Sequence, residues 1–592
     1  MPAQFFLDAP GLMSPADIAS LNGGSIADFY GLVPAGPVPP DPEKSLKHSN
    51  AVPSRYDVNL HNFSGTIAWD LDTFSFKSIT AYRYGRLKFD QDSLGAGTPG
   101  VVFFPLTHVT RQFTQEFNFS GAALGEKLDW LVGTFYFRDN ADFNTSVWLP
   151  TSGDSFLAAC GTTAGLAFLN ATLGCTTSTG AFPFALIPQG SFPYDAFQQF
   201  PSDPLTQITK SSSGRIPSAR VAPVEPGDVP ETAFLGFQTE QLSWSAAGFL
   251  QLNYHLTEKL GMTAGLRYTF DSKDVTRSLH SNLIATLINV GLASPVAPDG
   301  VTPTLCHEQK DDVTWDAFTG TVGVDYDVLD DVMVYAKYSR GYKGGGWNPG
   351  ECGENYDPEY LSAYETGVKS IFWDGQALAN AAFYWYDYED IQFTLYVPNQ
   401  SFIRNAGTAK AYGLELEYLL RPEVLAGIQL DGSVSWEKSR YGRGFFQDVA
   451  GIVQAPPLGP GISIEGNDLI RAPEWKVNLG GQYTYHAGSM GSFTARVEGS
   501  YTSTYFNDIF NGEAPFATET TQPSFWLGNA RVIWDSVDGR YQAMFFVDNF
   551  TEELYAENRV SFNTPSALVM VAGQFAAPRT FGARLSVKFG GD

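Results

Sequence analysis

Apolar and polar side chains alternate with a period of two along most of this chain. Between Leu260 and Phe270 the even positions carry Leu, Met, Ala, Leu, Tyr and Phe, whereas the odd positions carry Gly, Thr, Gly, Arg and Thr. The same pattern recurs in Tyr412–Leu420 and in Phe581–Phe589. Successive side chains of a β-strand point to opposite faces of its sheet, so each segment is predicted to be a strand with one apolar face and one small or polar face.

About seventeen such segments follow one another, the first beginning near Asn62 and the last ending at Phe589. A soluble antiparallel sheet would alternate in the same way. Three features favour a membrane barrel instead: many segments reach about ten residues or more, aromatic residues gather near strand ends, and short turns alternate with long polar connections. The sequence therefore predicts an all-β protein, a transmembrane antiparallel β-barrel with short periplasmic turns and long extracellular loops.

Composition argues against several other classes of protein. The chain has no run of about 18 apolar residues, which excludes a membrane-spanning helix. Its net charge of −26 argues against a nucleic-acid partner, because phosphate binding needs a basic surface. The seven His residues are scattered, without metal-ligand spacing and without the spacing of a nucleophile and base. We therefore expect no metal, no cofactor and no enzymatic activity, with an outer-membrane hydrolase as the least favoured alternative.

Four segments resemble the barrel of TonB-dependent outer-membrane receptors. Tyr338–Asn348 (YSRGYKGGGWN) resembles that family's strand-to-loop signature, and Pro358–Ser370 resembles the strand that follows it. Asn405–Glu417 is similar to a later strand, and Pro578–Phe589 to the closing strand. The order and spacing of the four segments are specific to the family, and the resemblance covers residues 62–589.

The resemblance implies that part of the family's architecture is missing from this sequence. A family barrel has about 22 strands, so the first strand expected here corresponds to the sixth. Residues 1–61 are unpatterned and rich in Pro and Gly, and we expect them to be the remnant of an extracellular loop, without a plug, a TonB-contacting box or a signal peptide. Because such a barrel has an even number of strands, seventeen strands predict two unpaired edges, with either an open gap or a smaller closure between them.

The resemblance also implies a function and a set of partners. The leading interpretation is the barrel of a receptor in the outer membrane of a Gram-negative bacterium, which takes up a scarce nutrient, foremost a ferric siderophore, and which is non-functional as truncated. The alternative is a passive outer-membrane pore or structural barrel without a plug. The expected partners are outer-membrane lipid, the siderophore, the TonB complex through the missing plug, and the barrel-assembly machinery. The family's C-terminal aromatic assembly signal corresponds to Phe589, although a tail of residues 590–592 follows it.

Aromatic and cationic residues of two outer loops could contact such a cargo, because these groups suit an aromatic, anionic complex. The alternative is that the aromatic residues among them belong to the outer interfacial girdle. The candidate residues are Tyr342, Lys343, Trp347, Tyr356, Tyr396 and Arg404.

Charged residues within the strands are expected to face the lumen. A charge facing lipid at the bilayer midplane costs about 2–4 kcal/mol, so the alternation assigns charges to the inner face and apolar residues to lipid. The even residues of Leu260–Phe270 and the odd residues of Phe581–Phe589 should therefore face lipid. The residues expected to face the lumen are Arg267, Glu365, Lys369, Glu415, Glu417, Arg584 and Lys588.

All four cysteines fall in expected outer loops, on the oxidising side of the membrane, where paired cysteines usually form disulfides. Cys160 and Cys175 lie in one long loop, whereas Cys306 and Cys352 lie in two consecutive loops. We predict the disulfides Cys160–Cys175 and Cys306–Cys352. The other pairings would have to join the large loop of residues 139–241 to its neighbours.

Overall fold

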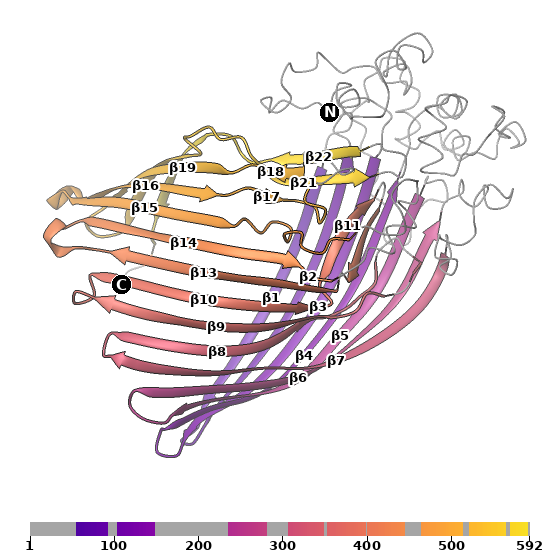
Figure 1. Ribbon diagram of the computed structural model, residues 1–592, viewed down its shortest axis with the longest axis horizontal. Coiled ribbons are helices and arrows are strands. Elements are labelled where there is room, and N and C mark those ends of the chain that lie inside the picture. Colours follow the sequence, from indigo (N-terminus) through magenta and orange to yellow (C-terminus); the bar gives the residue numbers. More distant parts are fainter. Residues whose placement is uncertain are drawn as a thin grey trace, which may run out of the picture.

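The computed structural model describes residues 55–92, 103–147, 235–280, 306–348, 352–353, 355–397, 400–405, 407–443, 463–512, 520–563 and 569–589. Within these ranges no helix is long and apolar enough to cross a membrane. Two short 3-10 helices, η3 (Glu423–Leu425) and η4 (Gly488–Met490), lie in turns between strands. Almost all of the remaining regular structure is β-strand (Figure 1).

Seventeen strands form one large antiparallel sheet, as the alternation predicted. Each strand pairs with the next strand of the set along the chain. The sheet curls into a wall that is seen from the side in Figure 1. Its strands are β1 (Arg55–Asp70), β2 (Ser75–Asp92), β3 (Phe103–Ala123), β4 (Leu128–Val147), β5 (Leu235–His255), β6 (Leu260–His280), β7 (Cys306–Leu329), β8 (Val332–Lys343), β9 (Glu359–Phe372), β10 (Ala377–Glu389), β13 (Thr408–Leu420), β14 (Ile428–Tyr441), β15 (Trp475–His486), β16 (Ser492–Thr502), β19 (Phe525–Asp535), β20 (Tyr541–Asp548) and β23 (Thr580–Val587).

Short turns gather at one rim of the wall and long connections at the other (Figure 1), which confirms the predicted segregation. Two short turns depend on glycine. Gly427 and Gly491 have φ angles of +90° and +88°, which side chains other than glycine rarely adopt. At Gly491 an added Cβ would also lie 2.0 Å from the carbonyl oxygen of Asp535 in the neighbouring hairpin. We call the rim with the short turns the turn rim and the opposite rim the loop rim.

Several strands extend further toward the loop rim than the sequence analysis predicts. The first strand begins at Arg55 rather than near Asn62, so the expected boundary between residues 61 and 62 falls inside β1. Strand β5 also begins within the expected loop of residues 139–241, and strands β3 and β7 begin before their apolar alternation does. Backbone pairing continues beyond the apolar segments because polar side chains interrupt the alternation without interrupting the hydrogen bonds. Three further hairpins, which the sequence analysis missed, lie at the loop rim: β11 (Gln392–Val397) with β12 (Gln400–Asn405), β17 (Tyr505–Phe506) with β18 (Thr521–Gln522), and β21 (Ala556–Asn563) with β22 (Val569–Phe575).

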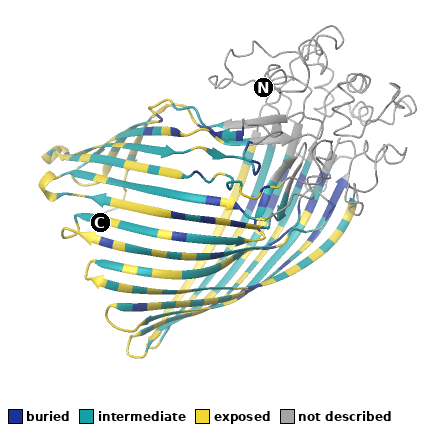
Figure 2. Cartoon of the chain, in the orientation of Figure 1, coloured by how far each residue is buried: buried dark blue, intermediate teal, exposed yellow. Residues whose placement is uncertain are grey.

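Exposed and less exposed residues alternate along many strands (Figure 2), and the two faces of the sheet differ in chemistry. On β6 the side chains of Met262, Leu266 and Tyr268 are 45%, 55% and 41% exposed, whereas Arg267 is half-buried and Thr269 is buried. The register carries this division from strand to strand, so we name the two sides of the wall the apolar face and the polar face. The apolar face is the surface that a barrel turns toward lipid.

An aromatic belt crosses the apolar face on β8, β9, β10, β13, β14 and β15. In the register Tyr364 pairs with Tyr338 on one side and with Trp385 on the other. The belt continues with Tyr412, which pairs with Trp385, and with the pair Trp436 and Trp475. Neighbouring ring centroids in the belt lie 5.0–6.5 Å apart wherever the rings are in contact. Tyr and Trp are the residues that membrane barrels place at the level of the lipid headgroups. The belt therefore marks a membrane boundary on this half of the wall.

A branched ion-pair network crosses three strands of the polar face nearer the turn rim. The guanidinium of Arg496 on β16 makes two hydrogen bonds of 2.8 Å to the carboxylate of Asp431 on β14 and one of 2.7 Å to Glu498. Arg496 reaches Asp431 across Gly480 of β15, where an added Cβ would lie 2.5 Å from Asp431 Oδ2 and 2.6 Å from Arg496 Nη2. A side chain at position 480 would therefore separate the two charges.

We expect Gly480→Ala to destabilise the folded wall by about 1–3 kcal/mol, because it displaces Arg496 from a half-buried carboxylate. The measurement is urea-induced unfolding in detergent micelles. The matched control is Gly499→Ala on β16, where an added Cβ meets nothing within 4 Å. Equal unfolding free energies for the two variants would contradict this account.

The two edge strands, β1 and β23, are exposed along most of their length. Phe63, Ile67 and Trp69 of β1 are 67%, 67% and 61% exposed, and Phe581 and Leu585 of β23 are 72% and 81% exposed. Among the described strands β1 pairs with β2 and β23 with β20, and no pairing joins β1 to β23. Both edges run from the loop rim toward the turn rim. Of the two expected outcomes, the described residues show the open gap.

Candidate functional site

The segment that follows β8 folds against the polar face of β6 and β7 at the loop rim. The hydroxyl of Tyr342 donates a hydrogen bond to the carboxylate of Asp271 on β6. The ammonium of Lys273, also on β6, donates to the carbonyl oxygen of Gly345 and lies 5.9 Å from the ring centroid of Trp315 on β7. Gly345 permits this approach, because an added Cβ would lie 2.6 Å from the Trp315 ring. The glycine-rich part of the YSRGYKGGGWN motif is therefore where the chain passes close to the wall.

A buried arginine and a disulfide hold the next part of the same segment. Arg277 of β6 is 2% exposed, pairs with Asp311 of β7 at 2.5 Å and donates to the carbonyl oxygen of Gly353 at 3.0 Å. Its guanidinium also lies 4.6 Å from the ring centroid of Trp347. Cys306 at the start of β7 is joined to Cys352, with the two Cα atoms 5.9 Å apart. This is the pairing predicted from the sequence, whereas Cys160 and Cys175 lie outside the described residues.

Two asparagines then tie this segment to the β11–β12 hairpin. The side-chain amide of Asn348 donates to the carbonyl oxygen of Ile403 and accepts from its backbone N–H, at 3.1 and 2.6 Å. Asn405 makes the same reciprocal pair with the backbone of Asp357, at 3.0 and 2.9 Å. Each amide reproduces the hydrogen bonds of a β-bridge between two loops. The segment is therefore fixed on both sides, by β6–β7 and by the hairpin.

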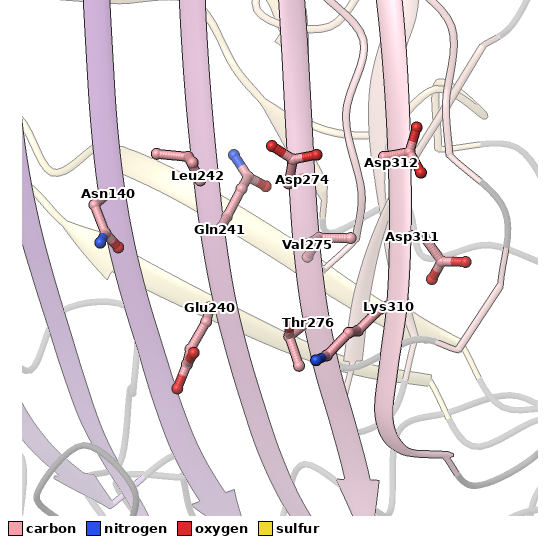
Figure 3. A pocket seen from close by; sticks show the side chains of 10 residues that line it. All are labelled: Asn140, Glu240, Gln241, Leu242, Asp274, Val275, Thr276, Lys310, Asp311 and Asp312. Atoms are coloured by element: carbon pink, nitrogen blue, oxygen red, sulfur yellow. The ribbon is translucent and has the colours of Figure 1, made fainter.

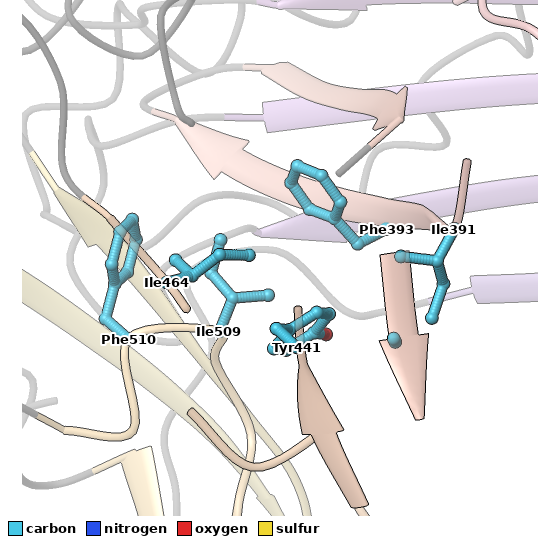
Figure 4. Packing of buried hydrophobic residues seen from close by; sticks show 7 residues of the cluster. Ile391, Phe393, Tyr441, Ile464, Ile509 and Phe510 are labelled. Carbon is cyan, nitrogen blue, oxygen red and sulfur yellow. The ribbon is translucent and has the colours of Figure 1, made fainter. Parts of the chain in front are cut away.

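Hydrophobic packing extends this assembly over three further connections (Figure 4). A buried cluster joins residues at the starts of β11 and β13 to the end of β14 and to the segments that follow β14 and β16. The side-chain amide of Asn511 and the backbone of Asp468 make another reciprocal pair, at 3.0 and 2.6 Å. We call these joined segments the loop cap. Its core consists of Ile391, Phe393, Ala409, Tyr441, Ile464, Ile509 and Phe510.

A shallow recess of about 350 Å³ lies across the loop-rim ends of β4, β5, β6 and β7 (Figure 3). Its lining is acidic: Glu240, Asp274, Asp311 and Asp312 contribute carboxylates and Lys310 an ammonium. Asp311 is already paired with Arg277. Among the described residues no group of His, Cys, Asp and Glu has an arrangement that could hold a metal ion.

The predicted cargo-contacting residues fall within or beside the loop cap, and most of them contact the protein itself. Lys343 projects, with its side chain 62% exposed and its ammonium 4.0 Å from Glu359. Burial raises the pKa of the Tyr356 hydroxyl. The indole nitrogen of Trp347 is buried and has no hydrogen-bond partner among the described residues. Arg404 donates to the carbonyl oxygen of Ile403, and Tyr396 belongs to β11, with its side chain outside the described set.

Several of the residues predicted to face the lumen share contacts across the polar face. Glu365 accepts a hydrogen bond of 2.7 Å from the Tyr335 hydroxyl and lies 3.1 Å from the Lys337 ammonium. Lys369 lies 5.7 Å from the ring centroid of the same tyrosine. Arg267 lies 5.4 and 5.6 Å from the rings of Phe135 and Phe249.

The other four residues of that set lie on β13, on β23 or directly after β23. Glu415 and Glu417 are exposed on β13, and Arg584 is paired with Met544 across β23 and β20. The backbone of Lys588 donates to the carbonyl oxygen of Arg540, just beyond the end of β23. Sequence reasoning places these groups on their strands but does not identify their neighbours.

Sequence reasoning missed Lys273, Arg277 and Trp315, the residues that hold the cap against the wall. Lys273 and Arg277 lie beyond Phe270, where the apolar alternation that predicted this strand ends. Their odd-numbered spacing continues that of Arg267 and Thr269 on the polar face. This continuation was the available signal, because a run of alternating positions does not have to be apolar to remain a strand.

The family model described as "TonB dependent receptor-like, beta-barrel" matches residues 7–556. The chain belongs to this family. The match reaches upstream of Asn62, into the stretch expected to be a loop remnant, and the resemblance noted in the sequence is confirmed. Outer-membrane β-barrels are the class to which the family belongs.

The chain is similar to a curated receptor in sequence and to solved siderophore receptors in fold. The pesticin receptor of Yersinia enterocolitica is 24% identical over 194 residues, which make up 32% of this chain and 25% of the relative. The ferric yersiniabactin uptake receptor FyuA of Yersinia pestis superimposes with a TM-score of 0.60 at 15% identity, over 90% of this chain and 62% of that one. The siderophore receptor PiuA of Acinetobacter baumannii gives 0.58 and 13%, over 90% and 65%. The receptor barrel thus spans less than two thirds of the length of each relative.

We expect the double variant Cys306→Ala/Cys352→Ala to lose about 2–4 kcal/mol of stability, because the bridge closes a loop of 46 residues in the unfolded chain. Hydrogen exchange should rise in residues 344–357 and stay unchanged in the η4 turn. Peptide mapping of the native protein by mass spectrometry checks the bridge directly, together with the predicted Cys160–Cys175 bridge. Unchanged exchange in residues 344–357 would show that the disulfide does not hold the cap.

Proposed function

We propose that this receptor barrel is part of an outer-membrane receptor of a Gram-negative bacterium for a ferric siderophore. The observation that carries the proposal is the loop cap, a packed assembly folded against the wall of a barrel whose family includes siderophore receptors. A fixed cap presents aromatic and cationic groups in a constant arrangement, which suits a rigid, anionic iron complex. The candidate contacts remain Tyr342, Lys343, Trp347, Tyr356, Tyr396 and Arg404.

The cap offers Lys343 as an accessible cation, with its side chain 62% exposed. The neighbouring candidates Tyr342 and Arg404 are engaged with Asp271 and Ile403, so they support the cap as well as lining it. An indole nitrogen without a partner at Trp347 is a hydrogen-bond donor that a ligand oxygen could satisfy. We therefore assign the first contact of an anionic cargo to the surface around Lys343, with the buried Trp347 donor available only to a ligand that enters the cap.

Energised uptake requires a plug domain in addition to the barrel. In the family the plug transmits the force from TonB, and we propose that residues 1–592 alone perform no TonB-dependent transport. The remaining expected partners are outer-membrane lipid at the apolar face and the barrel-assembly machinery at Phe589, whose side chain is 86% exposed. The polar-face residues Arg267, Glu365, Lys369, Glu415, Glu417, Arg584 and Lys588 are proposed to line the lumen.

Lys343→Gln should weaken binding of an anionic ferric siderophore by about five- to tenfold, because it removes a charge-assisted contact. Binding is measured by quenching of tryptophan fluorescence with a panel of ferric catecholate, hydroxamate and carboxylate siderophores. Lys127→Gln, an exposed lysine in the β3–β4 turn at the opposite rim, is the control and should bind like the parent protein. Failure of the parent protein to bind any member of the panel would contradict the proposed cargo class.

A passive pore is the alternative function, and the unpaired edges β1 and β23 are the observation that favours it. Planar-bilayer recordings separate the two functions. Steady conductance that a bound siderophore does not alter supports a pore, whereas binding without conductance supports the receptor.

A further inference from the structure

The apolar face carries a hollow across β4, β5 and β6, on the side of the wall away from the polar networks. Its volume is about 430 Å³, and apolar atoms dominate its lining. The floor is made of the small residues Thr134, Ala246 and Gly248, and a Cβ added at Gly248 would meet nothing within 4 Å. We call this hollow the lipid-side groove. Its flanks are the aromatic side chains of Phe117, Tyr136, Tyr268 and Phe270.

The register shows why the groove forms. Thr134, Gly248 and Tyr268 occupy one row across the three strands, and Tyr136, Ala246 and Phe270 occupy the next row toward the loop rim. Each row therefore has a small residue on β5 beside a ring on β6. The rings stand about 5 Å or more above the sheet on either side of β5, so the small side chains between them leave a channel along the strand.

A cation stands at the loop-rim end of the groove. Arg138 follows Tyr136 on the same face of β4, is exposed, and forms no ion pair with another described residue. From Leu128 to Arg138 is ten residues, or about 33 Å along a strand, which is about 25 Å of height at the usual tilt of about 40°. The apolar band of a membrane barrel has about the same height. With Leu128 at the border of this band near the turn rim, Arg138 lies at its opposite border.

A second arginine lies beside Arg138 on the neighbouring strand. Arg111 of β3 is paired in the register with Asn140, two residues above Arg138 on the same face. Its guanidinium makes a 2.9 Å ion pair with Asp142 and leaves further N–H groups on an exposed side chain. The groove thus has an apolar channel below and guanidinium groups above, and Arg is the residue suited to two-pronged binding of phosphate.

We propose that the lipid-side groove is a specific site for a phosphate-bearing, acylated lipid of the outer leaflet. One acyl chain lies along Gly248 and Ala246 between the aromatic side chains, and Arg138, with Arg111 beside it, holds the phosphate. The inference rests on the orientation of the wall in an outer membrane and is independent of the cargo. In a bilayer the acyl chain exchanges one apolar environment for another, so the phosphate contact supplies the selectivity.

The test uses the full chain purified in detergent, with lipid A and monophosphoryl lipid A as the probes and native mass spectrometry as the measurement. Gly248→Leu fills the groove without a backbone clash, because the space above Gly248 is empty. Arg138→Gln removes the charge and Arg138→Lys retains it. The matched control is Gly499→Leu, which adds the same side chain at a glycine of β16 that also has open space above it.

We expect at least a tenfold loss of lipid A binding in Gly248→Leu and Arg138→Gln, partial retention in Arg138→Lys, and unchanged binding in Gly499→Leu. The parent protein should prefer lipid A over the monophosphoryl form, and Arg138→Gln should abolish that preference. Equal loss in Gly248→Leu and Gly499→Leu, or no loss in either groove variant, overturns the proposal. A change of oligomeric state in Gly248→Leu with lipid binding intact also overturns it, because the groove would then be a protein contact.

Discussion

Backbone hydrogen bonding is the constraint on which the rest of this structure depends. Hydrocarbon offers no substitute for water, so each N–H and C=O group within the membrane must find its partner in a neighbouring strand. The sixteen pairings between consecutive strands of the wall supply these partners along most of the described strands, whereas the outer sides of β1 and β23 pair with no described strand. Backbone pairing thus determines the sheet, and the side chains determine which of its faces contacts lipid.

Glycine gives the polar face a second organising feature. Long side chains lie flat across glycines of adjacent strands: Phe249 covers Gly133, Tyr335 covers Gly367, and Tyr384 covers Gly413. Tyr335 and Tyr384 reach carboxylates by this route, Glu365 and Glu437, each at 2.7 Å. Large groups therefore run along the wall rather than into the space that it surrounds, and their hydroxyls are satisfied within the sheet. The network of Arg496 over Gly480 follows the same rule with a cation.

The strands and their number were predictable because the period of two is a local signal repeated many times. The alternation also identified the short turns, and the cysteine positions gave the Cys306–Cys352 pair. The loop cap was not predictable: its contacts, such as Asn348 with Ile403 and Asn511 with Asp468, join residues far apart in sequence and leave no periodic trace. The extended ends of β5 and β7 were missed for a related reason, since polar residues at strand ends look like loops when single-chain hydropathy is the guide.

The direction of the two free edges has a topological consequence. In an antiparallel cylinder, neighbours alternate between up and down, yet β1 and β23 both run from the loop rim to the turn rim. They cannot become antiparallel neighbours by any bending of the wall, and a substitution in either strand cannot change their sense. Parity alone requires that an antiparallel closure insert an odd number of strands between them. A single strand inserted between β1 and β23 could therefore pair antiparallel with both of them, whereas a two-stranded hairpin could not.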